Sequence, residues 1–188
     1  MEFDNSFDVP LPPAEAWKVL LDVRRIAPCL PGAELTEVVD AATCKGKVSV
    51  KLGPVALTFA GQVTFEDVDA VAHKARVKAR GTDAKGRGGA DAVVDFRLVP
   101  TASGTTVSVH TALSLSGAVA QYGRGVGMIE ALSAQLIGQF SDNLRRHLRE
   151  SAPAQSAAAP APVAPISGLA LILAALWRSL RRLFGGRP

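Results

Sequence analysis

The sequence predicts an α+β fold in which a curved antiparallel sheet of about seven strands holds one long C-terminal helix. Two short helices are expected after the first strand. Three observations support this fold class. Apolar and polar residues alternate between residues 33 and 116, which is typical of strands. Turn-forming residues interrupt that alternation at short intervals. Between residues 118 and 149 the apolar residues recur with the period of a helix.

The first 32 residues predict one strand and two short helices. Residues 2–9 alternate apolar and polar side chains, as a strand with one buried face does. The Pro12–Pro13 pair is typical of a helix start. The apolar residues that follow it at helical spacing are Trp17, Leu20 and Leu21. A second short helix is expected over residues 23–27, before a turn at Pro31–Gly32.

The alternating region predicts six strands that run as an antiparallel meander. Turn-forming residues cluster at residues 67–69, 81–83, 86–89 and 103–104. Because short turns can join only antiparallel neighbours, we expect each strand to pair with the next, and one face of the sheet to meet solvent. The residues that mark this wet face in one strand are Lys74, Arg76, Lys78 and Arg80.

The long helix is expected to span residues 118–149, with an unusual beginning. Its apolar stripe consists of Ile129, Leu132, Leu136, Phe140, Leu144 and Leu148. Each of the glycines at 117, 123, 125 and 127 lowers helix propensity by ~1 kcal/mol relative to alanine. The first turns are therefore expected to be frayed, held close to another backbone, or mobile.

The apolar face of the sheet is expected to line a ligand cavity opposite the long helix, whose glycine-rich start would lie at one mouth. Aromatic residues make up only 5% of the chain, so small and β-branched side chains would leave space that the protein does not fill. The expected lining residues are Val50, Leu57, Phe59, Val63, Phe65, Val77, Val94, Phe96, Val109, Leu113, Tyr122, Gly125, Met128, Ile129 and Leu132.

Charge and composition argue against several classes of function. Four arginines and no acidic residue follow residue 150, so the first 150 residues carry 17 basic and 17 acidic groups. A neutral body does not favour nucleic-acid binding, which needs a basic surface. Cys29 and Cys44 do not form a disulfide framework, and the acidic N-terminal segment is not a secretory signal. These features predict a cytoplasmic protein with reduced thiols.

No constellation in the sequence predicts catalysis or metal binding. The histidines at 73, 110 and 147 fall at a turn, on a polar strand face and near the end of the long helix, so they are not expected to converge. The glycine-rich residues 81–92 lack the spacing of a phosphate-binding loop and predict a hairpin turn. We therefore expect a protein that is not an enzyme.

The last 38 residues predict a linker and an anchor beyond the domain of residues 1–150. Residues 151–165 are rich in alanine and proline, which is typical of an extended linker. Residues 166–188 begin with twelve uncharged positions, which reach only ~18 Å as a helix. That is short of the ~30 Å hydrocarbon core, so an amphipathic helix lying on the membrane is favoured over a spanning one. The expected anchor residues are Leu169, Ile172, Leu173, Leu176, Trp177, Arg178, Leu180, Arg181, Arg182, Leu183 and Phe184.

Two alternatives to membrane binding remain for the anchor, namely docking on a partner protein and docking on its own domain. The arginines without an accompanying acid favour an anionic lipid surface, and the peripheral site would be the cytoplasmic face of the plasma membrane. A tethered helix that binds a protein would use the same kind of linker.

Five segments together resemble the CoxG family of carbon monoxide dehydrogenase accessory proteins, within the START/Bet v1-like (SRPBCC) helix-grip superfamily. They are CLPGA at 29–33, KLGPV at 51–55, FAGQVTF at 59–65, GTDAKGRGGADA at 81–92 and QYGRG at 121–125. The resemblance covers roughly the first 150 residues. It implies an accessory protein of a molybdenum-containing carbon monoxide dehydrogenase, and helix-grip relatives carry lipids, sterols or polyketides.

The resemblance and the expected anchor together suggest a carrier of a membrane quinone, of the menaquinone or ubiquinone type, with no covalent cofactor. The carrier would deliver the quinone to the dehydrogenase as electron acceptor. The hydroxyl of Tyr122 could bond a quinone carbonyl, or Tyr122 could simply anchor the helix start against the sheet. Two alternatives remain: a recruitment scaffold for the dehydrogenase without a ligand, and a helix-grip enzyme such as a cyclase or hydrolase.

Overall fold

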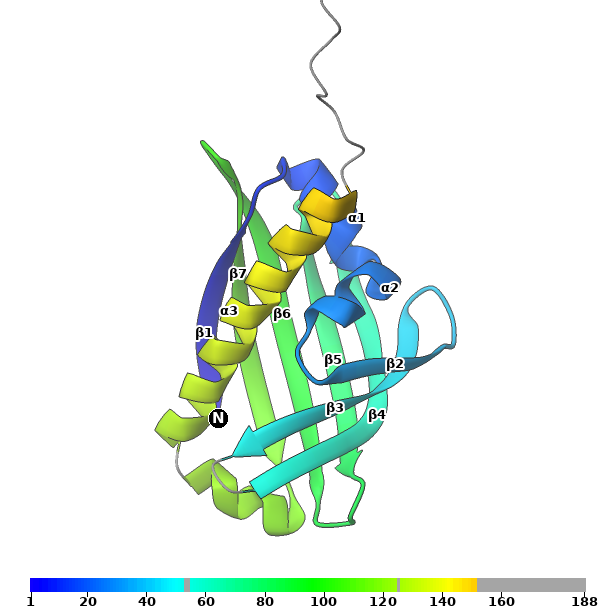
Figure 1. Ribbon diagram of the computed structural model, residues 1–188, viewed down its shortest axis with the longest axis vertical. Coiled ribbons are helices and arrows are strands. Elements are labelled where there is room, and N and C mark those ends of the chain that lie inside the picture. Colours follow the sequence, from blue (N-terminus) through cyan, green and yellow to red (C-terminus); the bar gives the residue numbers. More distant parts are fainter. Residues whose placement is uncertain (53–54, 125, 152–188) are drawn as a thin grey trace, which may run out of the picture. The chain divides into compact units, whose positions relative to one another are not determined.

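The computed structural model describes residues 1–52, 55–124 and 126–151, and these residues belong to one compact unit, Met1–Ser151. Within the described residues, seven strands form one antiparallel sheet in the order β1-β7-β6-β5-β4-β3-β2 (Figure 1). The strands are β1 (Glu2–Val9), β2 (Ala33–Val38), β3 (Thr43–Leu52), β4 (Val55–Asp69), β5 (Lys74–Asp83), β6 (Gly89–Thr101) and β7 (Gly104–Leu115). Strands 2 to 7 pair in sequence order, and β1 closes the other edge on β7, which confirms the predicted meander.

The helices lie before β2 and after β7, as predicted. They are α1 (Pro13–Leu21), α2 (Val23–Ile26), the 3₁₀ helix η1 (Ala27–Cys29), the 3₁₀ helix η2 (Gly117–Arg124) and α3 (Val126–Ser151). Pro13 occupies the first position of α1, where its missing N–H costs nothing. The Asp22 carboxylate accepts hydrogen bonds from the backbone N–H groups of Arg24 and Arg25, so it caps α2. Figure 1 shows α3 crossing the inner face of the sheet.

The beginning of the long helix differs from the prediction. Instead of one helix from residue 118, the chain forms η2 first and α3 begins at Val126. Gly117 has φ +64°, and a Cβ there would lie 2.8 Å from the carbonyl oxygen of Arg87. The N–H of Val119 donates to that same oxygen at 3.2 Å. Of the three expected behaviours, close approach to another backbone is therefore the one found at Gly117.

The sheet curves most strongly where β3, β4 and β5 meet at glycines. Gly46 pairs with Gly61, and Gly61 pairs with Gly81, in one row across the three strands. A Cβ on Gly61 would overlap the carbonyl oxygen of Arg80, so only glycine lets the two backbones come this close. Figure 1 shows the resulting bend, with β3 and β4 turned across the rest of the sheet.

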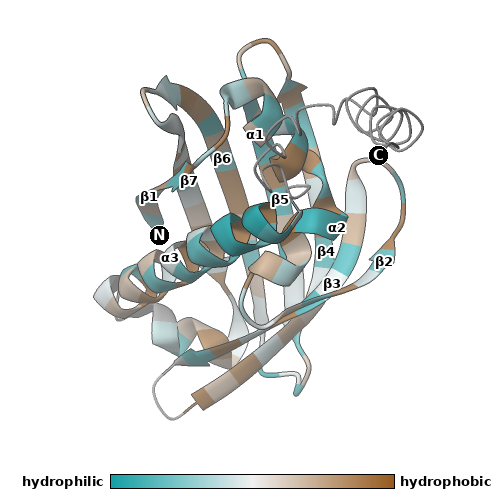
Figure 2. Cartoon of the chain, turned by 45° about the horizontal axis from the view of Figure 1, so that its top comes forward, coloured by the Kyte–Doolittle hydropathy of each residue, from teal (hydrophilic) through white to brown (hydrophobic). Residues whose placement is uncertain are grey.

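A buried apolar cluster joins the inner face of the sheet to α1 and α3. The rings of Phe7 and Phe140 meet edge to face at a centroid separation of 5.4 Å, and this contact fixes α3 on β1. Trp17 of α1 packs on Phe96 at 5.9 Å and on His73 at 5.6 Å. Figure 2 shows the hydrophobic strands behind α3 and the hydrophilic outward side of its C-terminal half. Among the described residues, no helix combines the length and the apolar character needed to cross a membrane.

Candidate ligand-binding cavity

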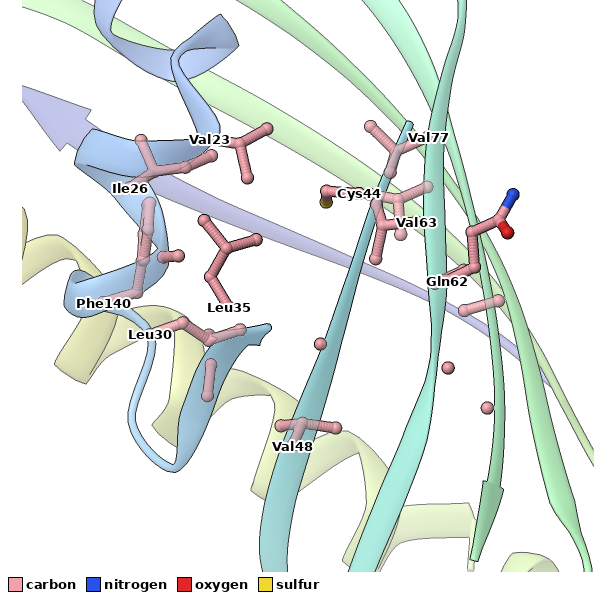
Figure 3. A pocket seen from close by; sticks show the side chains of 18 of the residues that line it. Val23, Ile26, Leu30, Leu35, Cys44, Val48, Gln62, Val63, Val77 and Phe140 are labelled. Atoms are coloured by element: carbon pink, nitrogen blue, oxygen red, sulfur yellow. The ribbon is translucent and has the colours of Figure 1, made fainter. Parts of the chain in front are cut away.

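A cavity of about 500 Å³ lies between the inner face of the sheet and the segments that cover it. Its floor comes from alternate residues of β3 to β7, and its cover comes from α2, η1, β2 and α3. Because successive side chains of a strand point to opposite faces, only one parity of each strand reaches the cavity. Figure 3 shows the side chains of Val23, Ile26, Leu30 and Leu35 facing those of the sheet across this space.

Small residues on neighbouring strands account for much of the empty volume. The row Gly46–Gly61–Gly81 continues to Ala90 of β6. The next row pairs Val63 with Ala79, and Ala79 with Ala92. All of these residues line the cavity. Positions with no side chain or a single methyl cannot fill the space under α3, so the sequence leaves the middle of the domain open.

The cover of the cavity is held by backbone contacts of the segment at residues 29–33. Gly32 has φ +74°, and a Cβ there would overlap the carbonyl oxygen of Ser49 in β3. The N–H of Ser49 donates to the carbonyl of Gly32 at 2.9 Å. On the other side, the Asn143 amide of α3 donates to the carbonyl of Cys29 at 3.0 Å. The turn therefore ties both β3 and α3 to the wall that carries Leu30.

The inner surface of the cavity is apolar. Its side chains are aliphatic or aromatic apart from the Cys44 thiol, whose pKa is raised by burial, and the polar residues at its border. Among the described residues, the buried polar side chains are Asp83, Thr105 and Ser141, and each bonds elsewhere. Thr105 donates to the Leu11 carbonyl at 2.7 Å, and Ser141 donates to the Asp8 carbonyl at 3.4 Å. Such a surface suits a hydrocarbon ligand.

Seven of the residues expected in the cavity line it. They are Phe59, Val63, Phe65, Val77, Val94, Phe96 and Val109. The structure gathers six others in a second apolar cluster around Phe3 and Val119, namely Val50, Leu57, Leu113, Tyr122, Ile129 and Leu132. Met128 is 47% exposed, and Gly125 lies outside the described residues.

The second cluster corrects the expectation that the start of the long helix forms a mouth of the cavity. Val119 of η2 is 1% exposed and packs with Leu57 of β4, which is also 1% exposed. Tyr122 packs against this cluster, and no described residue of η2 or of the first turns of α3 lines the cavity. The turn formed by η2 brings these apolar side chains inward, so they fill that end of the fold.

Several lining residues were not expected from the sequence. Those of the cover are Val23, Ile26, Leu30 and Leu35, and those of α3 are Ile137 and Phe140. The spacing of Val23 and Ile26 marks one helix face, but nothing in a sequence of four helical residues says what that face covers. Cys44 and Val48 lie on the same face of β3 as Val50, so strict alternation would have found them.

The groups with potential for chemistry lie apart from one another. No group of three or more His, Cys, Asp or Glu residues within the described part of the chain is arranged to hold a metal. His73 packs on Trp17, whereas the ring of His110 bonds to Asp4 at 2.8 Å on the outer face. Residues 84–88 form the predicted hairpin turn between β5 and β6. The expected linker and anchor residues, from 152 onward, lie outside the described residues.

Comparison with known proteins gives a family and a fold. Residues 6–149 match the family of the carbon monoxide dehydrogenase protein CoxG. No curated protein matches the chain. A conserved protein of Geobacillus kaustophilus has a similar structure, with a TM-score of 0.69 and 18% identity over 80% of this chain and 97% of that one.

Two further solved structures share the architecture. The ZhuI aromatase/cyclase of a Streptomyces species has a TM-score of 0.58 and 15% identity, over 82% of this chain and 96% of that one. A protein of Thermus thermophilus has a TM-score of 0.57 and 15% identity, over 81% of this chain and 100% of that one. At these identities the likeness establishes the fold alone, and it confirms the START/Bet v1-like helix-grip architecture.

Proposed function

The chain belongs to the CoxG family of carbon monoxide dehydrogenase, and from that premise we propose that it is a non-catalytic accessory protein of a molybdenum-containing carbon monoxide dehydrogenase. In this proposal the cavity takes up an isoprenoid quinone from the cytoplasmic membrane. The protein then brings the quinone to the dehydrogenase, where it serves as electron acceptor. The observation that carries the proposal is the apolar cavity of about 500 Å³ under α3.

The size of the cavity supports a ligand with several apolar units. An apolar cavity of ~150 Å³ holds one benzene molecule, so the volume found here corresponds to roughly three such rings. Ligand sites typically measure ~300–1,000 Å³. A quinone ring with a short stretch of its tail would fit, and so would several isoprene units without the ring. A complete membrane quinone with a long tail would extend beyond the cavity.

A carrier is supported better than an enzyme by the chemistry of the lining. A cyclase or hydrolase needs acid and base groups that converge on the substrate. The inward side chains here are hydrocarbon apart from one thiol, and the buried Asp83 is engaged by Arg87 instead of facing the cavity. The likeness to an aromatase/cyclase concerns the backbone, so it does not bring that activity to this chain.

Membrane attachment is assigned in this proposal to the C-terminal segment. Residues 166–188 combine an apolar stretch with arginines and contain no acidic residue. As an amphipathic helix they would place the arginines at anionic head groups and the leucines among the acyl chains. Residues 151–165 would then act as a tether that lets the domain move between the membrane surface and the dehydrogenase.

The experiment is native mass spectrometry and solvent extraction of the full chain produced in a quinone-containing bacterium. The test variant is Ala79→Phe, which puts a ring into the floor of the cavity, and the matched control is Ala60→Phe on the exposed face of β4. We expect quinone with the unaltered chain and with the control, and loss of most of it in the Ala79 variant.

Each other outcome has a distinct meaning. Bound phospholipid without quinone would leave a lipid carrier and remove the redox role. A chain that purifies empty, fails to extract quinone from vesicles and yet floats with them would replace the carrier with a recruitment scaffold. Equal quinone content in both variants would show that the ligand lies outside this cavity.

A further inference from the structure

The cavity has no free hydrogen-bond donor on its inner wall. Every buried side-chain nitrogen or oxygen among the described residues already has a partner within the protein. The buried Asp83 is bonded by Arg87, and Thr105 and Ser141 donate to backbone carbonyls of the N-terminal segment. The single polar atom on the inner wall is the sulfur of Cys44, and a thiol is a weak donor.

From this wall we infer that a quinone binds with its isoprenoid tail inside the cavity and its ring at the rim. The inference rests on the proposed function, and it adds the orientation of the ligand. The two carbonyl oxygens of a quinone ring are hydrogen-bonded in water. Buried against Val63, Val77 and Phe96, they would lose those bonds and gain none. Isoprene units lose nothing by leaving water and gain contacts along the same wall.

The polar side chains that border the cavity lie at its edge. They are Glu34, Lys45, Lys47, Gln62 and Arg80. All five are exposed, so their charged or amide groups stay in solvent. In Figure 3 the amide of Gln62 points away from Val63 and Val77. A ring at this edge keeps water or these groups as hydrogen-bond partners while its tail is buried.

The orientation of the ligand affects electron transfer. A ring at the rim can meet the dehydrogenase while the tail stays in the cavity, so the quinone would not have to leave the carrier before it is reduced. A ring held at the bottom of the cavity would instead be separated from the partner by the covering residues of α2 and η1. The apolar wall thus favours a carrier that presents its ligand without releasing it.

The first test is competition on the full chain loaded with a menaquinone of short tail. The two competitors are geranylgeraniol, which has an isoprenoid tail and no ring, and menadione, which has the ring and no tail. We expect geranylgeraniol to displace the menaquinone at concentrations at least about tenfold below those of menadione, because the tail makes the buried contacts. Displacement by menadione at the lower concentration would overturn the inference.

The second test places a hydroxyl on the inner wall. Val63→Thr keeps the shape and the strand preference of the side chain but adds a donor, and the matched control is Val38→Thr at the exposed end of β2. With the tail inside, the new hydroxyl is dehydrated against hydrocarbon, and we expect affinity for menaquinone to fall by about tenfold. Unchanged or tighter binding of menaquinone by the Val63 variant, with the control unaffected, would mean that the ring faces this wall. Failure of the unaltered chain to bind any menaquinone would instead remove the proposed function itself.

Discussion

The buried carboxylate of Asp83 forms a two-bond ion pair with the guanidinium of Arg87, four residues later in the same turn. Arg87 donates through Nε at 2.7 Å and through Nη2 at 2.8 Å, while the Asp83 side chain has no exposed surface. Nη2 also donates to the carbonyl of Ala56 at 3.0 Å. The carbonyl of Arg87 in turn accepts from Val119 of η2. One ion pair therefore joins the β5–β6 turn, the start of β4 and the segment that closes the second apolar cluster.

The first prediction concerns the acid stability conferred by this pair. The side-chain bonds from Arg87 hold the pKa of Asp83 far below its usual range. Its contribution to the free energy of unfolding is therefore fully present above the unfolded-state pKa of about 4, and it is lost as pH falls toward the depressed folded pKa. Asp83→Asn should lower the stability at pH 7 and flatten its fall between about pH 4 and pH 2. Urea unfolding at several pH values measures both effects.

The exposed pair of Arg80 and Asp91 provides the control for that experiment. Its atoms approach to 3.1 Å, but the two side chains are 83% and 58% exposed. Surface pairs of this kind contribute little, so Asp91→Asn should leave both the stability and its pH dependence close to those of the unaltered chain. An equal loss in the two variants would mean that the burial of Asp83 is unimportant.

The second prediction concerns the glycine row at the bend of the sheet. Gly61→Val adds a side chain that would overlap the backbone of β5, so we expect a loss of about 3 kcal/mol or more in the free energy of unfolding. Gly138 of α3 has no atom within 4 Å of an added Cβ. Gly138→Ala should therefore raise stability by about 0.5–1 kcal/mol through helix propensity. Chemical denaturation distinguishes the two, and a tolerated valine at position 61 would contradict the close approach of β4 and β5.

The fold could be predicted from the sequence because its signals are local. Alternation of apolar and polar residues gives the strands, and short turns force neighbouring strands to pair. The exact start of α3 was beyond such reasoning. Residues 117–124 have helical spacing, but the break after them depends on contacts of Gly117 and Val119 with Arg87, thirty or so residues away in sequence.

The cavity was predicted only in part for the same reason. Parity along a strand says which face a residue occupies, and this reasoning placed Val63, Val77 and Val94 correctly on the inner face. It cannot say where along the strand the cavity ends. Leu57 shares the face of Val63 but meets Val119, so it is buried in the second cluster. The position of η2 decides this, and that position follows from tertiary contacts.

The third prediction uses Cys44 as a reporter of the cavity. Burial raises the pKa of its thiol, so labelling by a small apolar maleimide at pH 7 should be slow and should accelerate as pH rises. A ligand in the cavity should slow it further, because Cys44 lies on the wall. Cys29 is 2% exposed, does not line the cavity and donates to the Arg25 carbonyl, so the ligand should not change its labelling. Mass spectrometry of labelled peptides measures both sites, and equal protection of the two would point to general stabilisation.

The fourth prediction concerns the edge of the sheet, where His110 of β7 bonds to Asp4 of β1. The hydrogen bond to Asp4, with its negative charge, raises the pKa of His110 above the ordinary value of about 6.5. The stabilisation is therefore fully present below pH 6.5 and is lost as pH rises through the folded pKa. NMR titration should show the raised pKa, and Asp4→Asn should bring it down. An unchanged titration in the variant would remove Asp4 as the cause.

The fifth prediction separates the domain from the segment that follows it. A chain ending at Ser151 keeps the compact unit Met1–Ser151 complete. It should unfold cooperatively at the temperature of the full chain and bind extracted menaquinone with the same affinity, because the cavity is lined by residues 7–140. It should lose its binding to vesicles that contain anionic lipid, since all four arginines after residue 150 are gone. Calorimetry, quinone titration and vesicle flotation measure the three properties.

The control for this deletion is a full chain with Arg178, Arg181 and Arg182 changed to glutamine, which keeps the apolar residues. A membrane anchor that relies on head-group phosphates should bind anionic vesicles more weakly in this variant, and the difference should shrink in neutral vesicles. If the segment instead binds the dehydrogenase, the deleted chain should lose the enzyme and not the vesicles. If it packs on its own domain, deletion should lower the unfolding temperature. Because quinone affinity is measured on the same samples, loss of membrane binding with an intact cavity would show that loading at the membrane and holding of the ligand reside in separate parts of the chain.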